Sequence, residues 1–354
     1  MRLLPVHLVL VLSSLTACAD EESPTQPGAA TNVEPMAASV AAAASNTWTI
    51  KAAPPNGAFV QGSSAGVMPD ANGDPVLYLL GGGDNDGGWS APILAYRLST
   101  NTWSFRGFEP TVDVFNSNGV GRIGKLLYIS GGENFSNGGF TIYGGLWAYD
   151  PATNVLTPKA EAPKITAAGV TGVIDGMLYV LPGLCSFDNF PHPYYCENEP
   201  FRRLFRYNPA TDHWVTKKSA PRVHISGAGG AIGGKLYVAG GLRTNALDRY
   251  DPATDSWTTL APIPVSGANV GYVRGTVLQG KLFVVSAHYN QNLGRYLTDA
   301  FSYDPATNVW TRKARPTYLH SDMAALTWNG KPYLLAVGGE DEHEVSNPAE
   351  LYTP

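Results

Sequence analysis

The chain is poor in charge. Charged side chains make up only 15% of its 354 residues, and the formal net charge is −5. A nucleic-acid-binding surface needs a basic patch or stripe, which this composition does not supply. We therefore expect no nucleic-acid partner.

The usual signatures of catalysis and cofactor binding are also missing. We find no phosphate-binding loop, no dinucleotide fingerprint, no nucleophile elbow and no zinc-spaced set of Cys and His. The sequence therefore predicts no cofactor and no metal. Asp70-Ala-Asn-Gly-Asp74 starts like a calcium loop, but Pro75 and Gly81 stand where that loop needs its glycine and its glutamate. We interpret this segment as a polar hairpin turn.

Long apolar runs are rare, and the one at the N-terminus indicates export. Arg2 precedes an apolar stretch from Leu3 to Leu15, which is too short to be a persuasive membrane span. Leu15-Thr-Ala-Cys18 then resembles the lipobox of bacterial lipoproteins, with an ordinary secretory signal as the alternative. The resemblance implies a signal peptide over residues 1–17, lipidation of Cys18 and, because Ala19 follows, the outer membrane. The mature chain would be extracytoplasmic, periplasmic or surface-exposed, and held to the membrane by this lipid only.

Residues 18–45 contain almost no large apolar side chains, so we expect a disordered tether before a folded domain at 46–354. Cysteine is scarce, at three residues. Cys185 and Cys196 bracket one short loop, and in an oxidising compartment we expect them to form a disulfide. A metal or redox pair is the alternative.

Glycine (39) and proline (27) are plentiful, and they recur at turn positions of an internal repeat. Four copies of one motif stand at Tyr149-Asp-Pro-Ala-Thr-Asn-Val-Leu156, Tyr207-Asn-Pro-Ala-Thr-Asp-His-Trp214, Tyr250-Asp-Pro-Ala-Thr-Asp-Ser-Trp257 and Tyr303-Asp-Pro-Ala-Thr-Asn-Val-Trp310. A looser fifth copy covers Tyr96 to Trp103, and six small pairs such as Gly240-Gly241 precede the copies.

Each repeat predicts four antiparallel strands. A small-residue inner strand (227–232) turns into an alternating strand (236–239), a third strand ends on the Tyr, and a fourth carries the Trp. The double glycine, the spaced Tyr and Trp and a period of about 50 residues resemble kelch repeats. The resemblance implies an all-β, six-bladed kelch-type β-propeller. The chain stops after a third strand at Tyr352, and Asn46-Thr-Trp48 matches the missing fourth, so we expect the N-terminal strand to complete the last blade.

The candidate ligand-binding face is the end of the propeller where the loops before the inner strands meet those after the double glycines. Alignment on the turn glycines places His224 and His320 at equivalent positions, which we expect near the channel mouth. The remaining candidates on this face are Arg222, Arg315, Glu133, Arg243, His288 and Glu340. Imidazole, carboxylate and guanidinium groups converging on one mouth could bind a small ligand, although propeller mouths are always polar and such residues are more often solvated or hydrogen-bonded surface groups. The catalytic residues, if any, are not identified.

Two enzyme families share the repeat. Periplasmic N-acetylneuraminate epimerases are six-bladed kelch propellers that use a Glu and Arg pair, which Glu133 or Glu340 with Arg243 or Arg222 could imitate. Galactose oxidases need two Tyr, two His and a Tyr crosslinked to a Cys, and the two available cysteines are better assigned to each other. The sequence favours a monomeric recognition module that binds a protein or a glycan at the cell envelope, with a carbohydrate-active enzyme resembling the sialic acid mutarotase as the alternative.

Overall fold

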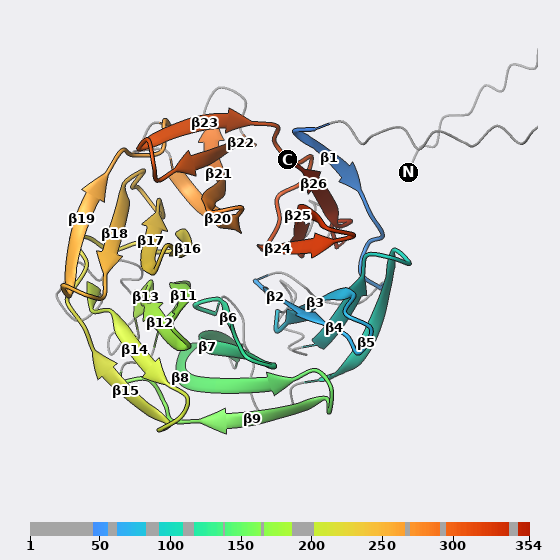
Figure 1. The fold of residues 1–354 in the computed structure, drawn as a ribbon, viewed down its shortest axis with the longest axis horizontal. Helices are drawn as coiled ribbons and strands as arrows, with labels where there is room; N and C mark the ends of the chain where they lie inside the picture. The colour runs from blue at the N-terminus through green and yellow to red at the C-terminus, as the bar shows by residue number, and fades with distance from the viewer. Residues whose placement is uncertain are drawn as a thin grey trace, which may run out of the picture. The chain divides into compact units, whose positions relative to one another are not determined.

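The computed structural model describes residues 45–55, 62–82, 92–108, 117–136, 139–163, 166–185, 202–265, 270–290, 295–339 and 346–354. These residues form strands and turns with no α-helix among them. Six four-stranded antiparallel sheets stand around a central axis, as Figure 1 shows. The predicted six-bladed propeller is therefore confirmed.

The first three blades run outward from the axis in sequence order. Blade one contains β2 (Ser64–Pro69), β3 (Pro75–Leu80), β4 (Pro92–Arg97) and β5 (Thr102–Phe108). Blade two contains β6 (Val120–Ile123), β7 (Leu126–Ser136), β8 (Gly139–Asp150) and β9 (Val155–Lys159). Blade three contains β11 (Val170–Ile174), β12 (Met177–Leu181), β14 (Phe205–Asn208) and β15 (His213–Thr216), beside a short ribbon of β10 (Thr166–Ala167) and β13 (Leu184–Cys185).

The last three blades include the closure of the ring. Blade four contains β16 (Ala228–Ile232), β17 (Lys235–Ala239), β18 (Leu247–Asp251) and β19 (Ser256–Leu260). Blade five contains β20 (Val270–Leu278), β21 (Lys281–Asn290), β22 (Arg295–Asp304) and β23 (Val309–Lys313). Blade six contains β24 (Asp322–Trp328), β25 (Lys331–Val337), β26 (Glu350–Thr353) and the N-terminal strand β1 (Thr47–Ile50).

Strand β1 closes the ring as expected. It pairs antiparallel with β26, with Trp48 opposite Tyr352. The indole Nε1 of Trp48 donates to the carbonyl of Ala314 in blade five at 2.7 Å. The Tyr352 hydroxyl donates to Asn46 Oδ1 at 2.9 Å, so residues from both ends of the propeller build one repeat. A closed ring leaves no blade with an unpaired neighbour.

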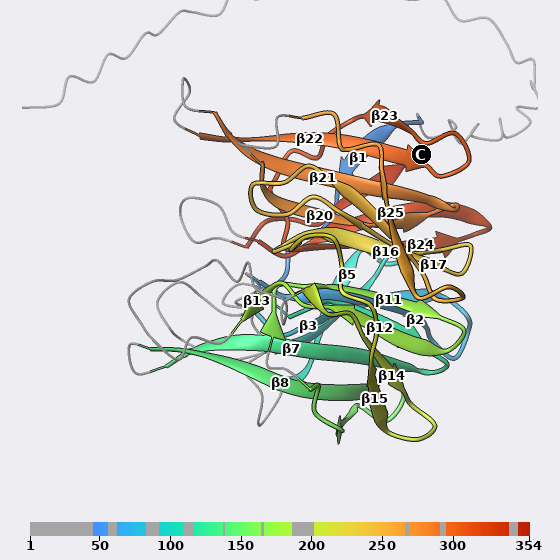
Figure 2. The same cartoon turned by 90° about the vertical axis from the view of Figure 1, so that its left-hand side faces the viewer.

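The hydrophobic core is divided into six parts, each lying between two neighbouring blades. The repeated tyrosines are the largest fully buried side chains: Tyr96, Tyr149, Tyr207, Tyr250, Tyr303 and Tyr352. Most stack on the tryptophan of their own repeat, as Tyr303 does on Trp310 at 5.1 Å between ring centroids. Both faces of each blade are therefore apolar and packed against the neighbouring blades. We expect functional residues on the loops at the two ends of the ring (Figure 2).

The double glycine after the second strand of blade four is required by crowding. Gly240 and Gly241 have φ of 65° and 119°, where L side chains are strained. A Cβ on Gly241 would also lie 2.7 Å from the carbonyl oxygen of Ile225. The loop that enters the inner strand can approach the second strand only because no side chain stands here.

The Asp70 segment is the polar hairpin turn between β2 and β3. One carboxylate oxygen of Asp70 accepts the backbone N–H groups of Asn72 and Asp74 at 2.8 and 3.0 Å. The other oxygen pairs with Arg97. These contacts hold the turn closed.

Candidate functional site

A central cavity of about 800 Å³ runs between the inner strands of all six blades. Much of its wall is small, with Gly66, Gly121, Gly172 and Gly229 on four different strands. Packing between blades imposes these glycines, because a Cβ on Gly121 would lie 2.2 Å from Leu178 Cδ1. Backbone edges therefore face the axis, which suits hydrogen bonding to a polar guest.

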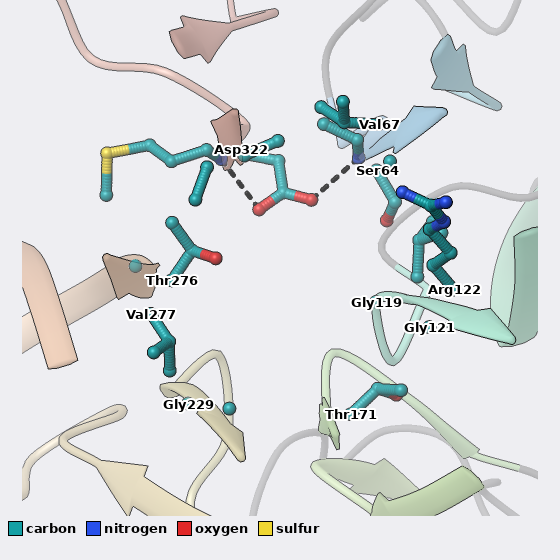
Figure 3. Close-up of a pocket in the computed structure, with 18 of the residues that line it drawn as sticks. Ser64, Val67, Gly119, Gly121, Arg122, Thr171, Gly229, Thr276, Val277 and Asp322 are labelled. Atoms are coloured by element: carbon teal, nitrogen blue, oxygen red, sulfur yellow. Dashed lines mark hydrogen bonds between the residues drawn. The ribbon is translucent and has the colours of Figure 1, made fainter. Parts of the chain in front are cut away.

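Three ionisable side chains line this cavity in the described part of the chain: Arg122, Arg274 and Asp322. Figure 3 shows the Asp322 carboxylate projecting from the start of β24 toward the open centre. It accepts the N–H of Ala65 in blade one at 2.7 Å and that of Met323 at 2.8 Å. Asp322 thus connects the last blade to the first at the inner edge of the ring.

The surroundings of Asp322 change its acidity. The side chain is half-buried and is partly accessible from the cavity that it lines. Burial raises the pKa of Asp322 to about 6, although its two backbone hydrogen bonds and the Arg274 guanidinium act in the opposite direction. A carboxyl with this pKa can hold or release a proton near neutral pH, a property that binding and catalytic sites share.

Arg274 lies in blade five beside Asp322. Its Nε donates to the Ser321 carbonyl at 2.5 Å and its Nη1 to the Val273 carbonyl at 3.3 Å. Burial lowers the pKa of this guanidinium, and the Asp322 carboxylate opposes that shift. The cavity wall thus carries a carboxyl group and a guanidinium group on two neighbouring blades.

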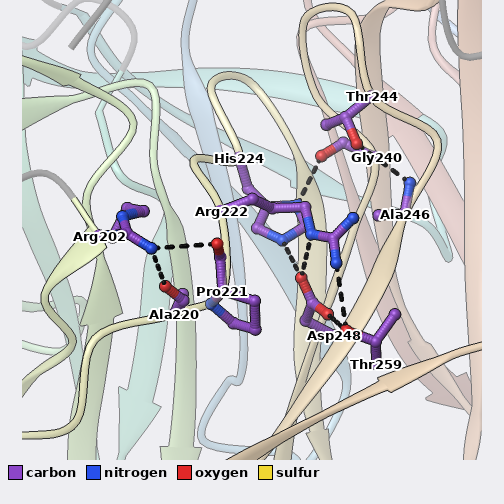
Figure 4. A network of polar contacts seen from close by, with 10 residues as sticks. All are labelled: Arg202, Ala220, Pro221, Arg222, His224, Gly240, Thr244, Ala246, Asp248 and Thr259. Atoms are coloured by element: carbon purple, nitrogen blue, oxygen red, sulfur yellow. Dashed lines mark hydrogen bonds and ion pairs between the residues drawn. The ribbon is translucent and has the colours of Figure 1, made fainter. Parts of the chain in front are cut away.

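His224 does not lie where we expected it. Its side chain is fully buried inside blade four, with Nδ1 2.7 Å from the Gly240 carbonyl oxygen and Nε2 3.0 Å from Asp248 Oδ2. Figure 4 shows the imidazole held between these two acceptors. Both ring nitrogens are engaged within the fold, so His224 fixes a loop and does not reach the channel mouth.

Arg222 belongs to the same cluster. Its Nε lies 2.9 Å from Asp248 Oδ2, and its Nη2 donates to Thr259 Oγ1 at 3.1 Å. Burial opposes ionisation of Asp248, yet the hydrogen bonds from His224 and Thr259 bring its pKa below the usual value. Asp248 is therefore an anion that holds the loop, the imidazole and the guanidinium together.

His320 repeats this arrangement in blade six. Its Nε2 lies 2.9 Å from Glu350 Oε2 and its Nδ1 3.2 Å from the Gly338 carbonyl oxygen, with only 3% of the side chain exposed. Glu350 also accepts the N–H groups of Thr317 and Tyr318 at 2.9 and 3.0 Å. Burial raises the pKa of Glu350, but these hydrogen bonds outweigh it and the net pKa is lowered.

The other candidates are scattered or undescribed. Arg315 Nη1 donates to the Thr298 carbonyl at 3.4 Å, and Arg243 is an exposed loop residue with a φ of 59°. None of the described candidates lines the cavity. The following lie outside the described side chains: Glu133, His288, Glu340, Cys18, Cys185 and Cys196. The lipid on Cys18 and the Cys185–Cys196 disulfide stay predictions.

Sequence reasoning missed Arg274 and Asp322, although a signal was present. Each is an ionisable residue in or beside a run of small and apolar ones, Gly-Tyr-Val-Arg-Gly for Arg274 and Ser-Asp-Met-Ala-Ala for Asp322. In a strand next to the axis, such a residue must face either a neighbouring blade or the cavity. Within the described ranges, no cluster of three or more His, Cys, Asp or Glu is placed to hold a metal ion, and no helix is long and apolar enough to cross a membrane.

Comparison with known proteins supports the repeat. A family model described as Kelch motif matches residues 227–264. The chain is 26% identical over 267 residues to N-acetylneuraminate epimerase of Haemophilus influenzae (strain 86-028NP), covering 71% of this chain and 59% of that protein. It is 26% identical over 250 residues to Kelch-like protein terF of Aspergillus terreus (strain NIH 2624 / FGSC A1156), covering 66% of this chain and 52% of that protein. The chain thus spans less than two thirds of the length of these relatives.

The same fold occurs in a solved structure. The structure of YjhT superposes with a TM-score of 0.65 at 18% identity, over 85% of this chain and 96% of that chain. At this identity the likeness concerns the fold alone. The six blades and their repeat therefore agree between sequence, structure and comparison.

Proposed function

We propose that this six-bladed kelch propeller is a recognition module held at the cell envelope through Cys18. It acts as a monomer and binds a protein or a glycan at the end of the ring where the inner strands begin. The observation that carries this proposal is the central cavity of about 800 Å³, whose wall consists largely of backbone and small side chains with Asp322 and Arg274 at one side. Such a wall recognises a ligand by shape and hydrogen bonding.

Two features of the fold support binding at this end. His224 and His320 fix the loops that lead into β16 and β24, so the rim is preorganised. The segments that join the second strand of each blade to its third strand differ in sequence and length between blades, as segments that determine binding specificity do.

A thermal-shift screen of residues 45–354 against monosaccharides, sialic acids, glycan fragments and divalent cations tests the proposal. A ligand at 100 times its Kd stabilises the native state by about 2.7 kcal/mol, which raises the melting temperature measurably. We expect a hit in which Asp322→Asn reduces the shift and the exposed Glu161→Gln does not. If no ligand gives a shift and no envelope protein is retained on the immobilised domain, the proposal is wrong.

The anchor has its own test. Metabolic labelling with a radioactive fatty acid should mark the wild-type chain, and Cys18→Ser should abolish the label and release the protein from the membrane fraction. A label that survives Cys18→Ser would contradict lipidation at this residue.

A carbohydrate-active enzyme related to sialic acid mutarotases is the second candidate. The 26% identity to N-acetylneuraminate epimerase favours it. Arg222 is tied to Asp248, so the acid and guanidinium pair offered by the described cavity is Asp322 with Arg274. Proton NMR of freshly dissolved N-acetylneuraminic acid tests this candidate. Faster anomer exchange with the wild type than with Asp322→Asn would favour the enzyme, and equal rates would exclude this site as its catalyst.

A further inference from the structure

The N-terminal strand connects three blades through a short segment, residues 46–52, which we call the strap. At its start, Asn46 Oδ1 accepts the backbone N–H of Ala314 in blade five at 3.0 Å. Its strand β1 pairs with β26 in blade six. At its end, the carbonyl of Ala52 accepts the indole N–H of Trp103 in blade one at 2.8 Å. The strap therefore joins the last two blades to the first on the outer side of the ring.

The strap buries little surface of its own. None of the four residues of β1 is fully buried, and Thr49 and Ile50 are exposed. Trp48 is the one large side chain of the strap that packs against an apolar core cluster. The neighbouring strand β26 instead places Leu351 and Tyr352 inside two of these clusters. Hydrogen bonds and one indole hold the strap, so it belongs to the least stable part of the ring.

A load that enters the propeller at Asn46 acts on the strap first. Strand β1 lies on the perimeter of the ring (Figure 1), and the cavity lies at its centre. When the propeller is held at its centre and pulled at Asn46, the line of force crosses the perimeter and therefore crosses β1. A strand loaded across its length loses its ladder hydrogen bonds one after another, beginning at the pair of Thr47 and Thr353.

The inner edge of the ring does not depend on the strap. Blade six contacts its neighbours there through Arg274 Nε, 2.5 Å from the Ser321 carbonyl oxygen, and through the Ala65 N–H, 2.7 Å from Asp322 Oδ2. Neither contact involves residues 46–52. Release of the strap lowers the stability of the ring, but unfolding of the remaining strands has a barrier of its own. The wall of the cavity therefore persists after the strap is released.

We propose that the strap is a force-releasable element: a load at Asn46 peels β1 from β26 while the other five blades and the rest of blade six stay folded. The released residues lengthen the connection to the propeller, and the exposed edge of β26 becomes available for pairing. In the cell, the proposed anchor at Cys18 and a bound partner supply the load. Only this origin of the load rests on the proposed function.

Single-molecule force spectroscopy of residues 45–354 tests the inference. One handle is attached at the N-terminus and the other in the exposed turn at Asp175 and Gly176 of blade three, across the ring. We expect a first extension of about 25–65 Å, because release of residues 46–52 alone, or of the chain as far as β2, frees ~3.5 Å per residue. Unfolding of the remaining strands should follow at higher force, with an extension of roughly 1,000 Å. A single extension of that size, with no short one before it, would show that the inference is wrong.

A load at the other end of the chain is the control for direction. The first handle is moved to Pro354, and the blade three handle stays in place. Strand β26 pairs with both β1 and β25, so peeling it breaks two ladders instead of one. We expect no short extension at the force that releases the strap. A short extension at equal force from Pro354 would contradict its assignment to β1.

Substitutions identify the strand that is released. Trp48→Ala removes the indole that donates to Ala314 and should lower the force of the first extension. Trp257→Ala, which removes the corresponding bond in blade four, should leave that force unchanged.

A disulfide across the two strands gives the second arm. Thr47 and Thr353 stand opposite each other, so Thr47→Cys with Thr353→Cys should abolish the short extension when oxidised and restore it on reduction. Wild type in the same reductant is the control. A short extension that persists in the oxidised variant would refute release of β1. Because the instrument applies the load directly, none of these outcomes depends on the anchor or on the ligand of the cavity.

Discussion

At the scale of single residues, one side-chain oxygen in each blade accepts a hydrogen bond from the buried tyrosine of the repeat. Each repeated tyrosine donates its hydroxyl to the Oδ1 of an Asn or Asp: Asn101, Asn154, Asp212, Asp255, Asn308 and Asn46. All six acceptors have a φ near 50°, where Asn and Asp are tolerated. In most blades the same oxygen also accepts a backbone N–H from the neighbouring blade, as Asn308 does from Ala261 at 3.0 Å. One atom therefore joins a buried tyrosine to the next blade.

Substitution of Asn308 tests this role. Asn308→Gly keeps the backbone conformation but removes both hydrogen bonds, and we expect it to lower the free energy of unfolding by about 1–2 kcal/mol. Asn308→Ala should lower it by ~1 kcal/mol more, because alanine is strained at positive φ. Asn308→Asp should be tolerated, since blades three and four use Asp here. Urea unfolding measures all three, and equal stability of the Gly and Asn forms would contradict the role.

Asp322 should give the propeller a pH-dependent stability. Its pKa is about 6 in the folded protein against an ordinary value of 3.8, so the native state binds the proton more tightly than the unfolded chain does. The free energy of unfolding should therefore be highest below pH 4 for this group and fall as pH rises toward 6, by at most about 3 kcal/mol before solvent screening reduces it. Asp322→Asn should remove this decline, whereas Glu161→Gln should retain it. Urea titrations between pH 4 and 7 measure the difference, and parallel profiles for wild type and Asp322→Asn would exclude it.

The histidines show where sequence reasoning reached its limit. Their equivalence was correct, since His224 and His320 make the same pair of contacts in two blades. Their direction was wrong, because an alignment gives position along a strand but not which way a side chain turns. The sequence contains a signal for the buried histidines, an acidic residue two positions before the repeated tyrosine. Asp248 and Glu350 occupy that position in these two blades only, and the other four have Leu94, Trp147, Phe205 and Phe301.

At the scale of strands, β1 contributes more than its four residues suggest. Trp48 packs against Tyr352 and Phe283, with ring centroids 5.1 and 6.2 Å away, and bonds Ala314 in blade five. The sequence predicted this strand because its Asn and Trp repeat those of blade one. The lengths of the elements were harder to predict. β7 and β8 extend to 11 and 12 residues, beyond what the repeat requires, because their outer ends pair with each other as a ribbon.

Deletion of residues 46–52 should therefore destabilise the whole propeller. It removes the outer strand of blade six and exposes the β26 edge and the apolar surface under Trp48. We expect a melting temperature lower by about 10 °C or more, or failure to fold. A deletion of seven residues between 25 and 31 is the length-matched control and should leave the melting curve unchanged. Identical melting of both deletions would refute closure by β1.

At the scale of the whole molecule, hydrogen bonds between neighbouring blades form a complete circle at the inner edge. The contacts, in order around the ring, are Ser64 with Ser117, Thr171 with the Asn118 carbonyl, Ser226 N–H with the Ala168 carbonyl, Val273 N–H with the Ser226 carbonyl, Arg274 with the Ser321 carbonyl, and Ala65 N–H with Asp322. Each lies beside the cavity. The residues that line the candidate site therefore also connect neighbouring blades, so a substitution that breaks one of these hydrogen bonds should alter the site directly.

The closure of blade six implies that the chain ends could lie in a different blade without changing the fold. If Pro354 were joined to Ala44, the chain would read Tyr352-Thr-Pro-Ala-Ser-Asn-Thr-Trp48, which parallels Tyr303-Asp-Pro-Ala-Thr-Asn-Val-Trp310. The two ends of the propeller thus fall inside one repeat. They interrupt the chain of blade six where the other blades have an exposed turn between the third and fourth strands. A circular permutant with this join and new ends between Ala253 and Thr254, the same turn of blade four, should fold with the circular dichroism of wild type and bind the same ligand. If the permutant fails to fold, folding requires the chain ends to lie in blade six. If it folds, the chain can also begin and end in the equivalent turn of another blade.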